Sequence, residues 1–424
     1  MKILLINYSD TGGGAAMAAV RLVNALNENG VYARLGVLKK SSANPYVFKL
    51  PQKKKLINNP LHEKIFNRIS EKLNNKIINI IFKTTNGIKH TTNFHSETDI
   101  NWINNSEFDI VNLHWINGVI CNKDIAKIKK PIVWTMHDSW PCCGAEHHPN
   151  VVENDTRWKE GYYRYNKPAT TKGIDLCRSV WKKKKKYLAN MNIVFTAPSQ
   201  WESEVLKSSA LFGPCKCEVI PNIIDHSLFY PRDKKLARKL LDIPTDKKIL
   251  GFGAAYDIDN PKSMKGSYYL IEALQKLRNL EKYFLVIFGP ASSVFTSKIT
   301  IPFFASGYIA NPNILATLYS LCDVVINPSL IENLPTTCLE SISCGIPVVA
   351  FDVGGTSDIV VHKETGWLAT PYKAEELVQG VEWCIENESF LRKKCLEKAA
   401  RDFDEKETVN RMIKVFESTL NYYR

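Results

Sequence analysis

The sequence lacks any apolar run long enough to cross a bilayer as a helix, since no stretch of about 18 apolar residues occurs. Its first residues, MKILLINYSD, contain neither the apolar region nor the small-residue cleavage site of a signal peptide. These absences predict a protein that stays in the cytoplasm.

A disulfide framework is also missing from the sequence. The cysteines number 11, which is odd, and three of them, Cys322, Cys338 and Cys344, fall in stretches that read as core strands and helices. This distribution is typical of buried thiols rather than of a secreted, cross-linked domain.

No standard zinc module is present either. Ligand chemistry for zinc does occur in one region of the chain, at Cys142, Cys143, His147, His148 and Cys177. Their spacing fits no standard finger or ribbon. The sequence therefore leaves open whether these residues bind a metal, and we expect no metal and no cofactor at the active site.

The dinucleotide-binding pattern G-x-G-x-x-G is absent as well. Residues 2–8 read as a buried strand that leads through SDTGGG into a helix, but Met17 occupies the position of the third glycine. A nicotinamide enzyme is thereby disfavoured. Gly12, Gly13 and Gly14 still allow either a close approach of a ligand to the backbone or a purely structural tight turn.

Acidic residues are scarce in one part of the chain. The net charge is +13, and residues 39–90 contain 12 Lys and Arg against 2 Glu. Within them, residues 61–83 predict a basic amphipathic helix, which either packs on the core with a solvated basic side or lies on an anionic membrane surface. Nucleic acid is a poor partner for this charge, because no recognised module or interleaved aromatic pattern accompanies it.

The length of 424 residues exceeds what one hydrophobic core usually organises, so two domains are expected. Apolar runs that alternate with helical stretches predict the parallel strands of two doubly wound α/β sheets. The first series of strands is expected at residues 2–8, 31–38, 108–115, 131–137 and 192–199. The second series is expected at residues 248–256, 285–290, 305–310, 323–329, 347–353 and 366–370.

Two strands of the first series end in histidines, His114 and His137. The carboxyl ends of parallel strands face the ligand crevice of α/β proteins, so both histidines are candidate cleft residues. Residues 138–187 follow and are too long and irregular for an ordinary connection. Aromatic faces stack on sugars and basic groups meet lipid phosphates, so the Trp, Tyr and Arg of this segment, Trp140 among them, predict a loop that faces a ligand.

The most informative stretch is residues 321–355, which reads as strand, loop, helix and strand. A helix is predicted over residues 336–344, with Pro335 in its first turn. The free amides of Leu334 and Thr336 at that helix start form an anion site. Glu332 and Glu340 flank the site, and we expect them to accept hydrogen bonds from sugar hydroxyls on either side of a phosphate.

The frame S-L-x-E-N-L-P-x-x-x-x-E-x-x-x-x-G-x-P-V-V resembles the E-x7-E element of retaining glycosyltransferases of family 4, which have the GT-B fold. This resemblance implies an α/β protein whose two Rossmann-like, doubly wound domains face each other across a cleft. It places Glu332 by the donor sugar and Glu340 on the ribose. The donor pyrophosphate is expected on the loop Asn333, Leu334, Pro335 and Thr336.

Other parts of the chain resemble the same family. His137, in T-M-H-D, matches the histidine that contacts the donor sugar, and Gly13 and Gly14 match the glycine turn near the donor phosphates. Lys265 matches a lysine that neutralises the diphosphate. The arginine that accompanies this lysine in the family is replaced here by Asp259 or Asn260, and Lys262 is the candidate substitute.

The domain limits follow from the same resemblance. We expect an acceptor-side domain over 1–222, with its insertion at about 138–187, and a linker over 223–247 that carries P-N-I-I-D. A nucleotide-sugar domain is expected over 248–403, followed by a helix over 404–424 that crosses back to the first domain. Asp358 stands where the family has the glutamate of its G-G-x-x-E turn. The insertion, with HDSWPCCG and DLCRSVWKKK, resembles a subset from bacterial exopolysaccharide and lipopolysaccharide clusters, including the colanic acid type. We then expect this loop to face the acceptor, with Trp140 on the acceptor side and His114 either there or satisfied in the core.

The function implied by the resemblance is a retaining, metal-independent transfer of a hexose from a nucleotide diphosphate sugar, UDP before GDP, to a lipid-linked or oligosaccharide acceptor. Lys262, Lys265 and the helix-start amides would stabilise the leaving diphosphate, while His137 and Glu332 would position the sugar. The anionic inner face of the plasma membrane is a candidate partner. A GT-B epimerase and a non-catalytic membrane-surface scaffold are the alternatives.

Overall fold

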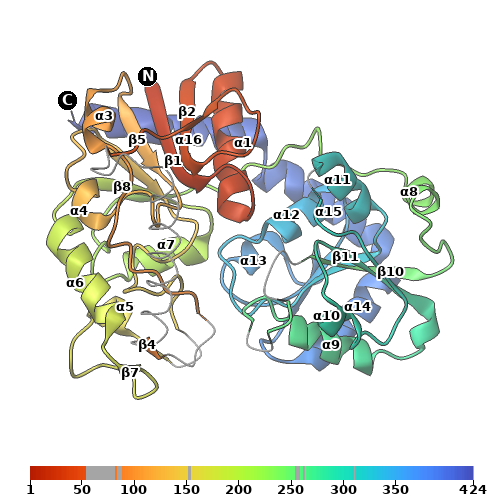
Figure 1. The fold of residues 1–424 in the computed structure, drawn as a ribbon. Helices are drawn as coiled ribbons and strands as arrows, with labels where there is room; N and C mark the ends of the chain where they lie inside the picture. Colours follow the sequence, from red (N-terminus) through yellow and green to blue (C-terminus); the bar gives the residue numbers. More distant parts are fainter. Residues whose placement is uncertain are drawn as a thin grey trace, which may run out of the picture. The chain divides into compact units, whose positions relative to one another are not determined.

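The chain folds into two units, each built around its own parallel sheet. A computed structural model describes residues 1–53, 82–83, 88–150, 154–253, 258–260, 263–309 and 311–423. Unit 1 comprises Met1–Thr196, Ser203–Glu218 and Val415–Arg424, and unit 2 comprises Ala197–Glu202 and Val219–Lys414. Figure 1 shows the strands and helices of both units with their labels.

The sheet of unit 1 has the strand order β3-β2-β1-β5-β6-β8-β9, and the pairs from β3 to β8 are parallel. Its central strands are apolar and buried on both faces, as parallel strands between helical layers must be. The strands are β1 (Lys2–Ser9), β2 (Tyr32–Lys39), β3 (Val47–Lys49), β5 (Ile110–Leu113), β6 (Ile132–Thr135), β8 (Ile193–Ala197) and β9 (Cys217–Val219).

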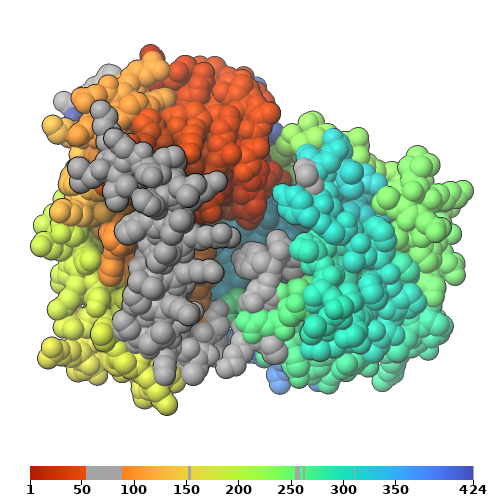
Figure 2. All heavy atoms as spheres, in the orientation of Figure 1, coloured from red at the N-terminus to blue at the C-terminus, as the bar shows by residue number. Residues whose placement is uncertain are grey.

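Helices connect these strands, and the insertion adds further elements. The helices are α1 (Gly14–Glu28), α3 (Ile100–Asn105), α4 (Asn122–Ile125), α5 (Arg157–Glu160), α6 (Leu176–Leu188) and α7 (Gln200–Lys207). Two short strands, β4 (Phe82–Lys83) and β7 (Lys172–Gly173), pair antiparallel away from the main sheet. In Figure 2, atoms of the insertion, in yellow-green, form part of the outer surface of unit 1.

The sheet of unit 2 has the order β12-β11-β10-β13-β14-β15, and its pairs are parallel. Alternate residues of the central strands enter two separate apolar clusters: Ile249 belongs to one, while Leu250 and Phe252 belong to the other. This period of two shows that both faces of the sheet are covered. The strands are β10 (Lys248–Gly253), β11 (Tyr283–Phe288), β12 (Phe303–Ala305), β13 (Val324–Asn327), β14 (Val348–Phe351) and β15 (Gly366–Ala369).

The helices of unit 2 follow its strands in alternation, which gives the predicted doubly wound pattern (Figure 1). They are α8 (Lys234–Leu240), α9 (Ser267–Lys276), α10 (Ser293–Thr296), α11 (Pro312–Ser320), α12 (Thr336–Ser343), α13 (Thr356–Ile359), α14 (Ala374–Glu386), α15 (Glu388–Asp402) and α16 (Glu405–Tyr423), with a 3-10 turn at Leu280–Lys282. The α/β class with two parallel sheets is therefore confirmed.

One predicted strand is wrong. Residues 305–310 were expected to be extended, but β12 covers Phe303–Ala305, in register with Leu285 to Ile287 of β11. Gly307 then adopts a φ of +67°, a left-handed conformation that no regular strand contains. Gly307 therefore prevents the strand that the apolar residues on either side of it predicted.

The segment 223–247 belongs to unit 2, although the sequence suggested a linker. Its helix α8 is fixed there by Arg238, whose Nη2 lies 2.8 Å from Oδ2 of Asp323, and both side chains are buried. Lys234 Nζ lies 2.9 Å from the other oxygen of the same carboxylate. Two cations therefore neutralise one buried charge at the start of β13, as a buried carboxylate requires.

The final helix α16 is shared between the units, since residues to Lys414 belong to unit 2 and residues from Val415 belong to unit 1. Within unit 1 its end is fixed by Tyr423, whose hydroxyl donates to the carbonyl of Asn192. Figure 1 shows both chain termini at the same end of unit 1.

Two further expectations concern membranes. The basic helix predicted over residues 61–83 lies outside the described residues, except for the two residues of β4. Within the part of the chain that is described, every helix is too short or too polar to cross a bilayer.

Candidate active site

The start of α12 is where unit 2 places most of the predicted donor-binding residues. The strand β13 ends at Asn327, a loop follows, and α12 begins at Thr336 after Pro335, which is the N-cap with ψ of 113°. The first backbone bond of the helix runs from Cys338 N to Pro335 O, at 3.1 Å. The amides of Thr336 and Thr337 precede that bond, so they lie at the positive end of the helix dipole.

Glycines let two other loops approach this one very closely. A Cβ on Gly266 would lie 1.8 Å from the carbonyl oxygen of Pro328, and a Cβ on Gly354 would lie 1.8 Å from that of Glu332. Both glycines have positive φ, +67° and +55°. Any other residue would clash with backbone at these positions, so the loop before α12 is fixed between the start of α9 and the turn after β14.

The charged residues of the site form an ion pair. Lys265, just before α9, places Nζ 2.7 Å from Oε1 of Glu332, and the two side chains are 27% and 16% exposed. The lysine and the first glutamate of the E-x7-E element, predicted from separate motifs, are therefore direct neighbours. A diphosphate bound at the start of α12 would meet this lysine as a counter-charge.

The second glutamate of the element is more enclosed than the first. Glu340 is 6% exposed, and its Oε2 accepts a 3.0 Å hydrogen bond from the hydroxyl of Tyr319 in α11. Burial and the neighbouring carboxylate raise the pKa of Tyr319 well above its usual value, so the phenol stays protonated and keeps donating. Tyr319 was not predicted from the sequence, where it reads only as a core position of an apolar helix.

The remaining predicted donor residues of unit 2 differ in how their side chains are used. Leu334 packs in the apolar core, so it can offer a ligand only its backbone, while Oδ1 of Asn333 accepts from Ser199 Oγ at 2.8 Å. Asp358 accepts from the amide of Gln200 at 2.6 Å. Lys262 lies outside the described residues.

In unit 1, the two predicted histidines bond to each other. His114 Nδ1 lies 2.8 Å from His137 Nε2, and His114 Nε2 lies 2.9 Å from Asn112 Oδ1. Burial lowers the pKa of His137 to about 4 and that of His114 well below its usual value. Both rings are therefore neutral at physiological pH. His114 is 3% exposed and both of its nitrogens are used within the protein, which makes it a support for His137.

A small pocket opens beside this histidine pair, at the carboxyl ends of β5 and β6. Its walls are formed by residues 114–117, 134, 136–138, 140 and 141. Trp140 is one wall, but it is 1% exposed and its indole N–H donates to the carbonyl of Thr91 at 3.0 Å. Trp140 therefore shapes the pocket without offering a polar atom to a ligand.

Asp138 is a pocket residue that was not predicted from the sequence. Its Oδ2 accepts from Trp115 Nε1 at 2.9 Å and lies 2.6 Å from His147 Nδ1. Burial raises the pKa of Asp138, but the charge and hydrogen bond of His147 outweigh it, so the pKa lies below the usual value. The carboxylate is ionised at neutral pH. It follows His137 directly, so the position at the strand end was the available signal.

The glycine turn of unit 1 is exposed and left-handed. Gly12 and Gly13 have φ of +76° and +86°, and α1 begins at Gly14. A Cβ at any of the three would meet nothing within 4 Å. The backbone conformation accounts for the first two glycines, and the space beside all three is open to a ligand.

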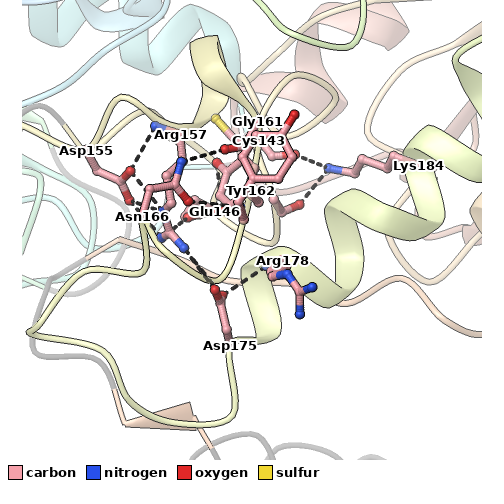
Figure 3. A network of polar contacts seen from close by, with 12 residues as sticks. Cys143, Glu146, Asp155, Arg157, Gly161, Tyr162, Asn166, Asp175, Arg178 and Lys184 are labelled. Carbon is pink, nitrogen blue, oxygen red and sulfur yellow. Dashed lines mark hydrogen bonds and ion pairs between the residues drawn. The ribbon is translucent and has the colours of Figure 1, made fainter.

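A buried ionic network holds the insertion together (Figure 3). Arg157 contacts the carboxylates of Asp155, Glu146 and Asp175, at 2.8, 3.4 and 3.3 Å. Lys184 of α6 is fully buried and donates to the carbonyls of Trp140, Cys143 and Gly144. Burial lowers its pKa to about 7. These contacts fix the ends of the insertion against one another.

One group of potential metal ligands lies at the edge of this network. Among the described residues, His90, Glu146 and Cys177 bring their ligand atoms within 4.8 Å of one another. Of the five residues considered from the sequence, only Cys177 belongs to this group, while His147 contacts Asp138 and Thr91. The guanidinium of Arg157 lies 3.4 Å from Glu146, so this carboxylate already has a charged partner within the network.

Comparison with known proteins agrees with the geometry of unit 2. Residues 233–402 match the family described as Glycosyl transferases group 1. The D-inositol 3-phosphate glycosyltransferase of Stackebrandtia nassauensis is 31% identical over 183 residues, which cover 39% of this chain and 40% of that protein. The chain spans less than half the length of the curated relatives it matches.

Solved structures resemble the whole chain. The Anabaena HepE structure in complex with UDP and glucose superposes with a TM-score of 0.64 at 16% identity, covering 99% of this chain and 100% of HepE. Sucrose-phosphate synthase from Thermosynechococcus elongatus gives 0.66 at 17% identity, covering 99% of both chains. The narrower resemblance to the colanic acid type stays a prediction. The chain as a whole therefore has the GT-B fold, and its residues 233–402 are similar to the Glycosyl transferases group 1 family.

Proposed function

We propose that this protein is a retaining, metal-independent glycosyltransferase that moves a hexose from a nucleotide diphosphate sugar to a lipid-linked or oligosaccharide acceptor in bacterial surface polysaccharide synthesis. The observation that carries the proposal is the pairing of Lys265 with Glu332 beside the start of α12, with Glu340 on the same helix. The relative from Stackebrandtia nassauensis is named as a glycosyltransferase, and HepE was solved with UDP and glucose. These names support a nucleotide-sugar donor, with UDP preferred over GDP.

The departing diphosphate is the main electrostatic problem of such a reaction. In our proposal, Lys265 releases Glu332 in part and pairs with the diphosphate, while the amides of Thr336 and Thr337 donate to its oxygens. The tight glycine contacts hold the loop before α12 in place, so these groups are already fixed when the donor arrives. Preorganised donors of this kind stabilise developing charge without a metal ion.

The sugar itself is assigned to Glu332 and His137, and the ribose to Glu340. The bond from the anomeric carbon to the diphosphate breaks, and the acceptor oxygen bonds to the same face of that carbon. The acceptor proton passes to the departing phosphate oxygen, so no protein nucleophile is required. Glu332 therefore serves to orient hydroxyls. Transfer should be slower in Glu332→Gln, and no glycosyl adduct should be trapped on Glu332 of the wild type.

The acceptor and the location are further parts of the proposal. The basic residues between 39 and 90 carry most of the excess positive charge, and anionic lipid headgroups attract such segments. We place the enzyme in the cytoplasm, at the inner face of the plasma membrane, where a lipid-linked acceptor would be presented.

Isothermal titration calorimetry with UDP, GDP, ADP and CMP tests the donor half of the proposal. We expect one nucleoside diphosphate to bind, with the same affinity in EDTA. Binding that requires a divalent cation would contradict the metal-independent mechanism. Absence of binding by every nucleotide would contradict the donor class itself.

A further inference from the structure

Three potential metal ligands meet at the edge of the insertion in unit 1. A ring nitrogen of His90, a carboxylate oxygen of Glu146 and the sulfur of Cys177 lie within 4.8 Å of one another. Zinc holds such atoms at about 2.0–2.3 Å, so the ligands of one tetrahedral ion lie roughly 3–4 Å apart. Small side-chain adjustments would therefore bring all three atoms onto a single ion. The proposed transfer reaction uses none of these residues.

The backbone holds the first two ligands opposite each other. His90 and Glu146 form an antiparallel bridge between two segments of unit 1. The amide of His147 donates to the carbonyl of Lys89 at 3.0 Å, which keeps the two segments in this register. Residues directly opposite in an antiparallel pair place their side chains on the same side, with Cβ atoms about 4.5–5.5 Å apart. The histidine and the carboxylate are thus neighbours because of the backbone pairing.

The third ligand comes from the first turn of α6. The side chain of Asp175 caps this helix by accepting from the amide of Arg178 at 3.0 Å, and Cys177 lies between them in the sequence. A Cβ on Gly144 would lie 2.6 Å from the carbonyl oxygen of Cys177 and 2.7 Å from Oε2 of Glu146. The glycine therefore allows the start of α6 to approach the carboxylate closely.

The ligands have the supporting contacts that metal ligands usually have. The ring of His90 donates to the carbonyl of Ile88, so the other ring nitrogen of a neutral imidazole is an acceptor. Arg157 Nη2 lies 3.4 Å from Oε1 of Glu146, and the hydroxyl of Tyr162 lies 3.4 Å from Oε2. Contacts of this kind orient metal-binding histidines and carboxylates.

The ionic network of the insertion has more carboxylates than cations (Figure 3). Its carboxylates are Glu146, Asp155 and Asp175, and its cations are Arg157 and Lys184. Each of these side chains is at most 11% exposed. A buried excess of negative charge is unfavourable. Zinc brings two positive charges and binds a thiolate, whose proton leaves to solvent, so binding neutralises this excess.

We propose that His90, Glu146 and Cys177 bind a zinc ion, with water as the fourth ligand, and that the ion fixes the start of α6 to the paired segments. Ligand sets of nitrogen, oxygen and sulfur suit zinc. Glu146 is 4% exposed and Cys177 is 1% exposed, which keeps substrates away and makes the role of the ion structural. The inference goes beyond the proposed function and does not depend on it, because the predicted donor-binding lysine and glutamates belong to unit 2.

The test uses the full-length protein without an affinity tag. The metal is removed by acidic dialysis with a chelator, because protonated ligands release it, and the protein is then titrated with Zn²⁺ or Co²⁺. A cobalt–thiolate bond gives a charge-transfer absorption in the near ultraviolet. The variants are Cys177→Ser and Glu146→Gln. Cys142→Ser is the matched control, because Cys142 is also a fully buried thiol of the insertion but lies outside the group.

We expect the wild type to bind about one zinc ion per chain. Its cobalt form should show the thiolate absorption, and zinc should raise its unfolding midpoint. Replacing a residue that supports a ligand costs about 10–100-fold in metal affinity, so Cys177→Ser and Glu146→Gln should lose at least about 100-fold. Cys142→Ser should bind as the wild type does, and the midpoint of Cys177→Ser should not respond to zinc.

Several outcomes would overturn the inference: a wild type without the thiolate absorption, zinc affinity unchanged in Cys177→Ser, or an absorption that Cys142→Ser removes. If Cys177→Ser does not fold, Glu146→Gln decides, because it keeps the thiol and the size of the side chain, and unchanged affinity there would overturn the site. Nucleotide titrations of the zinc-loaded protein test the proposed function separately. Zinc binding without nucleotide binding would contradict that function and leave the zinc site standing.

Discussion

Replacing Lys265 with alanine should weaken the binding of a nucleoside diphosphate about 10- to 150-fold. The lysine lies 2.7 Å from Glu332, beside the start of α12, and it is partly shielded from water. A hydrogen bond to a charged group contributes about 1.5–3 kcal/mol, which corresponds to that range of dissociation constants at about 1.4 kcal/mol per factor of ten. Calorimetric titration of the wild type and Lys265→Ala with the same nucleotide measures the difference.

A second substitution makes this prediction sharper. In Lys265→Ala, the carboxylate of Glu332 is left without its partner and repels the diphosphate, so adding Glu332→Gln should restore part of the lost affinity. Lys276→Ala is the control, because Lys276 also pairs with a glutamate of unit 2, Glu375, at 2.5 Å, but is 40% exposed. Affinity within twofold of the wild type in Lys265→Ala, or an equal loss in Lys276→Ala, would refute the reasoning.

Three further predictions concern stability and pH. Because burial lowers the pKa of His137 to about 4, below the roughly 6.5 of an unfolded chain, its contribution to the free energy of unfolding is complete above about pH 6.5 and should decline as the pH falls toward 4. Urea midpoints should follow this course, and a His137→Gln variant should decline less. Tyr319→Phe removes the hydrogen-bond donor to the buried carboxylate of Glu340. It should lower the free energy of unfolding, measured in urea, by about 1–3 kcal/mol, and it should also weaken nucleotide binding. An unchanged urea midpoint would contradict the role of this contact. Arg238→Met should lower the free energy of unfolding by about 3 kcal/mol in the same measurement, because it removes one of the two cations that pair with buried Asp323. An unchanged free energy of unfolding would mean that the second cation is enough to stabilise this carboxylate.

The sequence predicts unit 2 well because its signals are local. The run from 323 to 351 alternates apolar strand, glycine or proline punctuation and helix, and β13, α12 and β14 form within a few residues of the expected limits. The pairing of Lys265 with Glu332 required two motifs to be matched to one family. The strand predicted over residues 305–310 was wrong because Gly307 adopts a left-handed conformation, which outweighs the apolar residues around it.

Residues whose roles depend on distant partners could not be predicted in this way. Asp138 looks like any polar residue after a strand, and only its contacts with Trp115 and His147 mark it. Tyr319 reads as a helix core position until the fold brings it to Glu340, 21 residues away. Lys184 stands in a run of five lysines that suggests a solvated helix face, yet it is fully buried and bound by three backbone carbonyls. Such positions are defined by tertiary contacts, which pattern and propensity do not encode.

Turnover of a nucleotide sugar tests the central claim most directly. Wild type and Lys265→Ala would be incubated in EDTA with UDP-glucose, UDP-galactose, UDP-N-acetylglucosamine and GDP-mannose, with water or a simple glycoside as acceptor, and followed by proton NMR. The account predicts that the wild type releases the nucleoside diphosphate from one donor, that the sugar first appears with the anomeric configuration of that donor, and that Lys265→Ala is much slower. Release that requires a metal ion, or a product that first appears with the opposite configuration, would contradict it.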